Sequence, residues 1–208
     1  MNAAASGLIE AIKYALGADP YVYPPGSTGT DWDLVPTGGT SWYKWGGGGI
    51  NSWGTACGVP NGCVAVLNLM NLNTATFCDQ LMFYMCQTEF PIRGLRDLMS
   101  DPTYGWDTSF APIPMDDDEV LAYTTANSPL CHASVSKWAY AAGVNMSATT
   151  PYATAHKTDR CAKVAAAGAA FTAELLNGAI SSLTMPELTA DCYSCHQLSS
   201  LPAQQGKM

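Results

Sequence analysis

The stretch TDRCAKVAAAGAAFTAELLNGAI, residues 158–180, carries the longest helix that the sequence predicts. Its apolar part, from Val164 to Leu176, is rich in alanine, is shorter than the roughly 18 apolar residues that a membrane helix requires, and includes Glu174. No other stretch of the chain comes nearer to that length. We therefore expect this helix to pack inside a soluble protein that has no membrane span.

A shorter helix is predicted at the N-terminus, over residues 3–16. Leu8, Ile9, Ile12 and Leu16 form one apolar stripe at helical spacing, and Gly17 follows as a stop signal. We expect this stripe to pack on the body of the protein or on a neighbouring chain.

Another helix has strong signals at both of its ends. Ser128 and Pro129 are typical of a helix N-cap and a first-turn proline, and Gly143 is typical of a helix end. Since no internal repeat is visible, the fold class that we predict is mainly α. The remaining predicted helices cover residues 62–71 and 76–89, as an antiparallel pair, and a short segment after Pro186.

Glycine and aromatic residues dominate a long segment near the N-terminus. The chain has 19 glycines and 13 prolines, most of them among the first 115 residues, so this half is expected to be rich in loops. We predict one core made from three parts: an N-terminal helix over 1–17, a Gly/aromatic-rich arm over 18–56, and a helical domain over 57–208.

The charge of the chain excludes one class of partner. The formal net charge is −8, and the nine basic residues form no cluster, so the electrostatic footprint of a nucleic-acid-binding protein is missing. The acidic run Asp116 to Glu119 is typical of a solvated loop, although it would also suit a basic redox partner.

The cysteine motif CYSCH near the C-terminus, residues 192–196, predicts a covalently bound haem. Cys192 and Cys195 are spaced to add to the two vinyl groups of one haem c, and His196 then binds the iron from below. The alternative is a redox dithiol or half of a zinc site, but no further ligands at zinc spacing lie nearby.

The sixth ligand of the haem iron would decide between electron transfer and chemistry at an open iron. The two remaining histidines, His132 and His156, are the preferred candidates for the distal axial position. The haem that they bind is either that of the same chain or that of another subunit. A thioether from Met146 or Met185 is the alternative.

Six further cysteines need an explanation. An even number outside the cytoplasm favours disulfides, with an iron–sulfur cluster or metal site as the alternative. Cys78 and Cys86 are eight residues apart, about 12 Å on a continuous helix, so they are too distant to bridge each other and are free or pair with a neighbouring chain. The full set is Cys57, Cys63, Cys78, Cys86, Cys131 and Cys161.

These cysteines carry a resemblance to known families, which extends over about residues 55–196. The segments are Cys57-Gly58, Gly62-Cys63, Cys131-His132-Ala133-Ser134-Val135-Ser136-Lys137-Trp138 and Arg160-Cys161-Ala162. They are similar to redox proteins with the signature C, GC, C, C. With the haem motif at the C-terminus, the arrangement resembles the split-Soret cytochromes c.

The resemblance implies a mainly helical homodimer whose haems meet at the subunit interface, with an axial histidine given across it. It also implies that Cys57, Cys63, Cys131 and Cys161 can hold iron and sulfur. One feature departs from the family, because split-Soret cytochromes have two haem motifs per subunit and this chain has one. The segment 128–132 has the shape of a second motif without its first cysteine.

From these observations we expect a c-type cytochrome that carries electrons through a bis-histidine haem. We expect it in the periplasm or outside the cell. Since residues 1–16 lack the basic region of a signal peptide, we expect that a leader was removed before this numbering begins. A self-associated form, a homodimer in the first place, would bring haems close together. The alternatives are a haem enzyme of the peroxidase or reductase type, and a subunit that polymerises through the arm.

Overall fold

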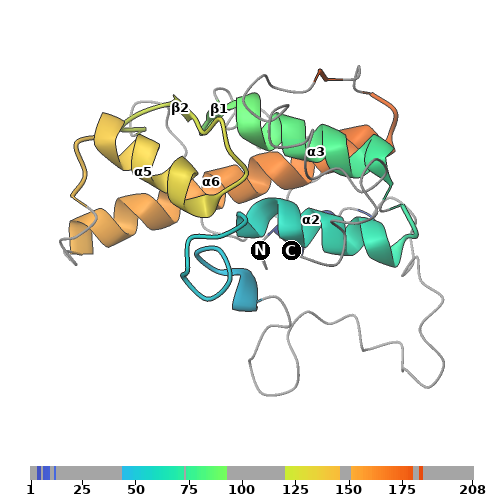
Figure 1. Cartoon of the computed structure of the whole chain (residues 1–208), viewed down its shortest axis with the longest axis horizontal. Helices are drawn as coiled ribbons and strands as arrows, with labels where there is room; N and C mark the ends of the chain where they lie inside the picture. The colour runs from blue at the N-terminus through green and yellow to red at the C-terminus, as the bar shows by residue number, and fades with distance from the viewer. Residues whose placement is uncertain are drawn as a thin grey trace, which may run out of the picture.

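A computed structural model describes residues 4–5, 7–9, 12, 44–72, 74–92, 120–145, 151–179 and 183–184, and every structural statement below concerns these residues. This part of the chain is mainly helical, which confirms the predicted fold class (Figure 1). Its elements are η1 (Lys44–Gly46), α2 (Gly58–Leu69), α3 (Ala75–Gln87), β1 (Glu89–Phe90), β2 (Thr124–Thr125), α5 (Cys131–Ala141) and α6 (Pro151–Leu176).

The long helix α6 is the element around which the others are arranged. Helices α2 and α3 contact its C-terminal half and each other, whereas α5 lies near its N-terminal half (Figure 1). The short strands β1 and β2 pair antiparallel, with Phe90 opposite Thr124, and this ladder joins the end of α3 to the segment before α5. The two ends of α6 therefore have different neighbours.

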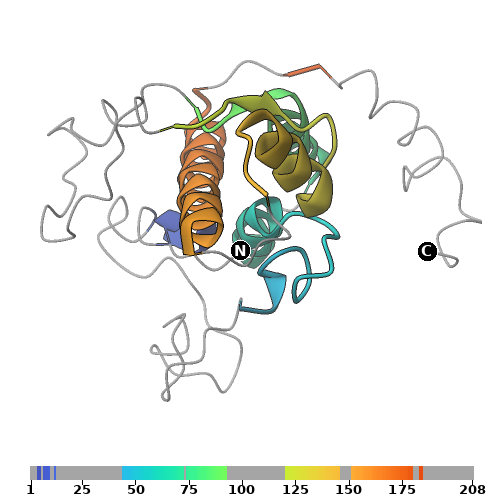
Figure 2. The ribbon, with the colours of Figure 1, turned by 90° about the vertical axis from the view of Figure 1, so that its left-hand side faces the viewer.

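The N-terminal stripe packs on the body of the protein. Residues 4, 5, 7–9 and 12 are helical, and Leu8, Ile9 and Ile12 are buried in the main core, as the sequence predicts. An added Cβ at Gly7 would lie 3.9 Å from the Cβ of Ala169, so this helical stretch lies against α6, as Figure 2 also shows. Leu16 and Gly17 lie outside the described residues.

Close packing between α2 and α6 depends on a glycine. A Cβ at Gly168 would overlap the side chain of Val59, so the two helices approach more closely than any larger residue would allow. Apolar side chains from α2, α3 and α6 complete the main core, and a smaller cluster forms around Trp138, Ala139 and Val144.

Several predicted boundaries were wrong. Helix α6 begins at Pro151 rather than residue 158, since a proline fits the first turn of a helix. Helix α2 begins at Gly58, four residues earlier than predicted, and also has a proline, Pro60, in its first turn. The helix predicted after Pro186 lies outside the described residues.

The start of α5 was also predicted wrongly. Leu130, not Ser128, occupies the N-cap position, and α5 runs from Cys131 to Ala141. The Ser128 hydroxyl instead accepts a hydrogen bond from the Leu130 N–H, at 3.2 Å. The reason is tertiary, because Ala56 and Leu130 form an isolated antiparallel bridge that keeps this segment extended.

Within the predicted arm, residues 44–53 form η1 followed by a compact turn. Gly48, Gly49 and Gly54 have positive φ angles, and the backbone N–H of Gly54 donates to the Gly48 carbonyl at 2.9 Å.

No helix among the described residues is both long and apolar enough to cross a membrane.

Candidate functional site

The predicted haem motif, Cys192, Cys195 and His196, lies outside the described residues. The structure does describe hydrogen bonds that the chain makes shortly before this motif. Gln80 of α3 bonds to both backbone groups of Leu183, accepting from its N–H and donating to its carbonyl at 3.2 Å. The segment that leads to the motif is therefore attached to α3 nine residues before Cys192. Met146 and Met185 also lie outside the described residues.

Three of the predicted cysteines meet between different elements. The N–H of Cys57 donates to the Pro129 carbonyl at 2.9 Å, and the N–H of Cys131 donates to the Thr55 carbonyl at 2.8 Å. Side chains alternate across such a pairing, so the side chains of Cys57 and Cys131 lie on one face as diagonal neighbours. Cys161 of α6 lies near enough to both that a thiolate there would raise the pKa of Cys57 and of Cys131.

Two of these thiols stand at helix N-termini. Cys57 is the N-cap residue of α2, and the nearby backbone of Val59 lowers the pKa of its thiol. Cys131 is the first residue of α5. The partial positive charge of a helix N-terminus favours an anion, so both positions suit a thiolate.

Burial nevertheless keeps these thiols protonated when no metal is bound. Desolvation is the largest influence on both Cys57 and Cys131, and it raises the pKa of each above its usual value. Neighbouring thiols raise the pKa of Cys131 further, whereas Lys157 and Arg160 lower it. A metal that binds here would release protons, because the thiolate is the ligand.

Cys63 lies apart from the other three signature cysteines. Its side chain is fully buried in the main core, where it is hydrogen-bonded to the Thr172 side chain, and desolvation raises its pKa to about 11. Of the other cysteines, only Cys57 influences its pKa. The structure therefore divides the predicted set of four into a group of three and a core residue.

None of the six described cysteines forms a disulfide in the structure. The disulfides that the sequence favoured therefore do not occur among the described cysteines. Helix α3 is continuous from Ala75 to Gln87, and Cys78 and Cys86 do not bridge each other, as predicted.

The donor set has the chemistry of an iron–sulfur site. Among the described residues, no three histidine, cysteine or carboxylate side chains are placed to hold one metal ion. Cys57, Cys131 and Cys161 come from three separate segments, and thiolates are the ligands of iron–sulfur clusters.

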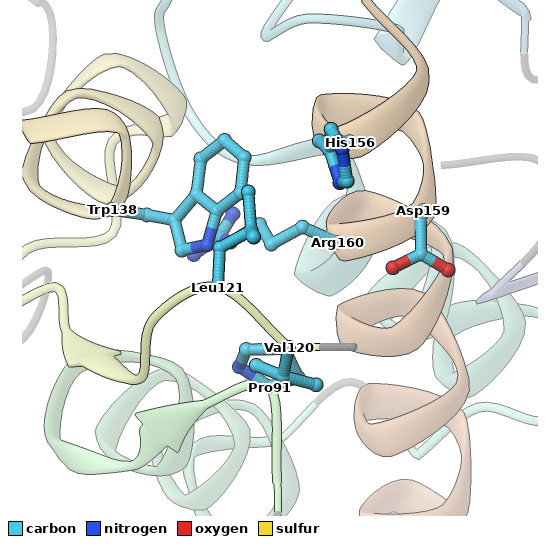
Figure 3. A pocket seen from close by; sticks show the side chains of 7 residues that line it. All are labelled: Pro91, Val120, Leu121, Trp138, His156, Asp159 and Arg160. Atoms are coloured by element: carbon cyan, nitrogen blue, oxygen red, sulfur yellow. The ribbon is translucent and has the colours of Figure 1, made fainter. Parts of the chain in front are cut away.

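The two candidate distal histidines occupy different environments. His132, the second residue of α5, is exposed, and its backbone N–H donates to the Gly54 carbonyl at 3.0 Å. An added Cβ at Gly54 would lie 3.0 Å from the His132 Cβ, so the turn of the arm lies against this residue. His156 is partly buried on α6 and lines a small pocket with Trp138 and Arg160 (Figure 3).

Large apolar side chains are exposed in the segments next to His132. Trp53 is 82% exposed, and Trp45, Ile50 and Leu130 are each about half exposed. The first three belong to the aromatic arm, and Leu130 precedes α5. These four residues are called the His132 apolar surface below.

Arg160 was missed as a site residue by the sequence analysis. It is only 3% exposed, and its Nη2 donates to the Ser134 hydroxyl at 2.6 Å, whereas its Nε has no partner in the structure. Figure 3 shows its side chain extending from α6 toward Trp138 of α5. The available signal was a charged residue beside Cys161 on the buried side of a mostly apolar helix.

Comparisons with known proteins point to one relative. The chain is 25% identical, over 169 residues, to the split-Soret cytochrome c of Desulfovibrio desulfuricans, an alignment that covers 77% of this chain and 53% of the relative. The chain thus spans about half the length of this relative. No protein-family model matches the chain, so its likeness to the redox proteins with the four-cysteine signature stays a prediction.

The fold supports the same likeness. A solved structure, described as a novel iron centre in the split-Soret cytochrome c of the same organism, superposes with a TM-score of 0.57 and 22% identity. The superposition covers 95% of this chain and 72% of that one. The chain is therefore a weak homologue of split-Soret cytochrome c with a similar fold.

Proposed function

We propose that this protein is a c-type cytochrome that carries electrons outside the cytoplasm. The observation that carries the proposal is the CYSCH motif at 192–196, in a chain whose sequence and fold resemble a cytochrome c. Cys192 and Cys195 would hold the haem through thioether bonds, and His196 would bind its iron. The haem, when bound, supplies a one-electron couple.

His132 is the better placed of the two candidates for the sixth position. Its side chain is exposed and lies beside the His132 apolar surface, so a haem approaching from outside the described core would find a ligand and an apolar border together. His156 is partly buried against Trp138 and Arg160, and a haem would have to displace these neighbours to reach it. A homodimer in which one subunit supplies His132 to the other's haem fits this placement.

A second redox centre would use Cys57, Cys131 and Cys161. Their thiols come from three segments, two of them at helix N-termini that favour thiolate. An iron–sulfur cluster held there would exchange single electrons with the haem. The chain's own part is to fix the three ligands on the α2 and α5 N-termini and on α6, and to exclude water from Cys63 and the core behind them.

The test is a reduced and oxidised absorption spectrum of the purified protein, with haem and non-haem iron counted per chain and the spectrum repeated under carbon monoxide. One low-spin haem c that does not bind carbon monoxide is the expected result. A high-spin haem that binds carbon monoxide would favour an enzyme, and a protein without haem after expression with a cytochrome c maturation system would contradict the proposal.

Matched variants identify the axial ligand. His132→Ala should convert the haem to a high-spin form that binds carbon monoxide, whereas His156→Ala should leave the spectrum unchanged. Mixing His132→Ala with a Cys192→Ala, Cys195→Ala variant tests donation between subunits, because a heterodimer regains one low-spin haem only if the histidine crosses the interface. The opposite ranking of the two histidine variants would refute the assignment of His132.

A further inference from the structure

The described part of the chain buries a guanidinium for which no carboxylate partner is found. Arg160 is 3% exposed, and its Nη2 donates hydrogen bonds to the hydroxyl and the carbonyl of Ser134. The nearest carboxylate along the chain, Asp159, forms an ion pair with Lys163 at 2.9 Å. A buried charge is costly unless an opposite charge or hydrogen bonds compensate it, so Arg160 is suited to an anion that the metal-free protein lacks.

The geometry places this charge beside the three thiols. Arg160 directly precedes Cys161 on α6, and its partner Ser134 lies one turn after Cys131 on the same face of α5. The hydrogen bond between Arg160 and Ser134 therefore holds the guanidinium between the helices that supply two of the thiols. Cys57 also lies near enough for the charge of Arg160 to act on its sulfur.

We propose that Arg160 is the counter-ion of the site formed by Cys57, Cys131 and Cys161, and that it sets how tightly this site retains an anionic iron–sulfur centre. The role rests on the second redox centre proposed above. Arg160 is a positioning residue and not a ligand, since a guanidinium has no lone pair to give to a metal.

Two physical consequences follow for such a centre. Three thiolates with a cluster carry net negative charge, which becomes larger on reduction, so a fixed cation in a poorly solvated site stabilises the reduced form and raises the reduction potential. The unpartnered Nε–H of Arg160 is also available to donate to a sulfur of the site.

Other cations near the site are less suited to this role. Lys163 is buried too, but its Nζ is paired with Asp159 one turn away on α6. Lys157 influences the pKa of Cys131 and is only partly buried, so water screens its charge more strongly. Lys163 therefore supplies a matched control, a buried cation on the same helix that already has its own counter-ion.

The experiment uses the full-length protein, reconstituted without oxygen with ferrous iron and sulfide. Arg160→Gln, Arg160→Lys, Ser134→Ala and Lys163→Gln are compared with the unchanged protein. The readouts are non-haem iron and acid-labile sulfide per chain, the rate of iron loss to a chelator, and the midpoint potential of the non-haem signal. Circular dichroism reports whether each variant is folded.

We expect Arg160→Gln to weaken iron retention by about 10- to 100-fold, as is typical for residues that support metal ligands, and to lower the midpoint potential. Arg160→Lys should fall between this variant and the unchanged protein, and Lys163→Gln should match the unchanged protein. If Arg160→Gln does not fold, Ser134→Ala provides the test, because it keeps the charge but releases the guanidinium, and faster iron loss is expected.

The outcomes separate the two proposals. A folded Arg160→Gln protein, or a folded Ser134→Ala protein in its place, that keeps the unchanged rate of iron loss and potential overturns the role of Arg160 alone. An unchanged protein that holds no non-haem iron, or one whose iron survives Cys161→Ser, overturns the thiolate centre and the role of Arg160 with it.

Discussion

Replacing Gly168 with alanine tests the closest contact between α2 and α6. Gly168 lies in the middle of α6, and an added Cβ would come closer than 3.0 Å to Cγ1 of Val59 on α2, a separation that real Cβ atoms essentially never show. Val59 is 6% exposed and β-branched, so its side chain has little freedom to turn away. The helices must therefore move apart to accept the methyl group.

Two opposing effects set the size of the result. Extra volume in a packed core costs about 1–3 kcal/mol, and alanine is favoured over glycine in a helix by about 1 kcal/mol. We expect Gly168→Ala to lower the free energy of unfolding by about 1 kcal/mol, taking the middle of these ranges. Because Cys57 precedes Val59 by two residues, the shift should also disturb the group of three thiols.

Urea unfolding followed by circular dichroism measures this change. Gly7→Ala is the control, since a Cβ there would lie 3.9 Å from Ala169, an ordinary contact, and the helix preference should raise stability by about 0.5–1 kcal/mol. In a double-mutant cycle, Val59→Ala should reduce the loss of stability caused by Gly168→Ala, because it removes the Cγ1 methyl group that the added Cβ would overlap. A Gly168→Ala protein as stable as the Gly7→Ala protein would refute the reasoning.

Three further predictions concern other parts of the described structure. Burial raises the pKa of Tyr84 to about 12, so the neutral form of its side chain is favoured in the folded state. The stability that this preference gives the fold is complete below pH 10 and should be lost between pH 10 and 12. Melting curves over this pH range, with Tyr84→Phe as the control, measure the loss. Gln80→Ala removes both hydrogen bonds to Leu183 and should speed amide hydrogen exchange at Leu183 by about fivefold, for a net loss of roughly 1 kcal/mol. Cys63 is fully buried, so iodoacetamide should label Cys78 in the native protein but label Cys63 only after unfolding; equal labelling of both would contradict the burial of Cys63.

Helices could be predicted from the sequence where their signals are local. The spacing of Leu8, Ile9 and Ile12 predicts a helical stripe, and these residues are buried as expected. The helix that becomes α3 was placed to within two residues at each end, because a threonine precedes it and a proline follows it closely. Such patterns depend only on residues within a few turns of each other.

Features that depend on distant partners were missed. The two-residue ladder of β1 and β2 is too short to have a recognisable pattern, and it exists because segments about 35 residues apart pair. The bridge between Ala56 and Leu130 likewise moved the start of α5 away from Ser128, since the pairing keeps Leu130 extended. At this position the tertiary contact therefore outweighs the preference of Ser128 for a helix N-cap.

The candidate site shows the same division. By itself, the sequence determined the mainly helical class and the residue types that predict haem attachment, because helix periodicity and the spacing of two cysteines and a histidine are local properties. Only the tertiary structure decided that Cys57, Cys131 and Cys161 meet while Cys63 enters the core, and that Arg160 is buried beside them. These relations depend on how α2, α5 and α6 pack, and side chains far apart in the sequence become neighbours only through that packing.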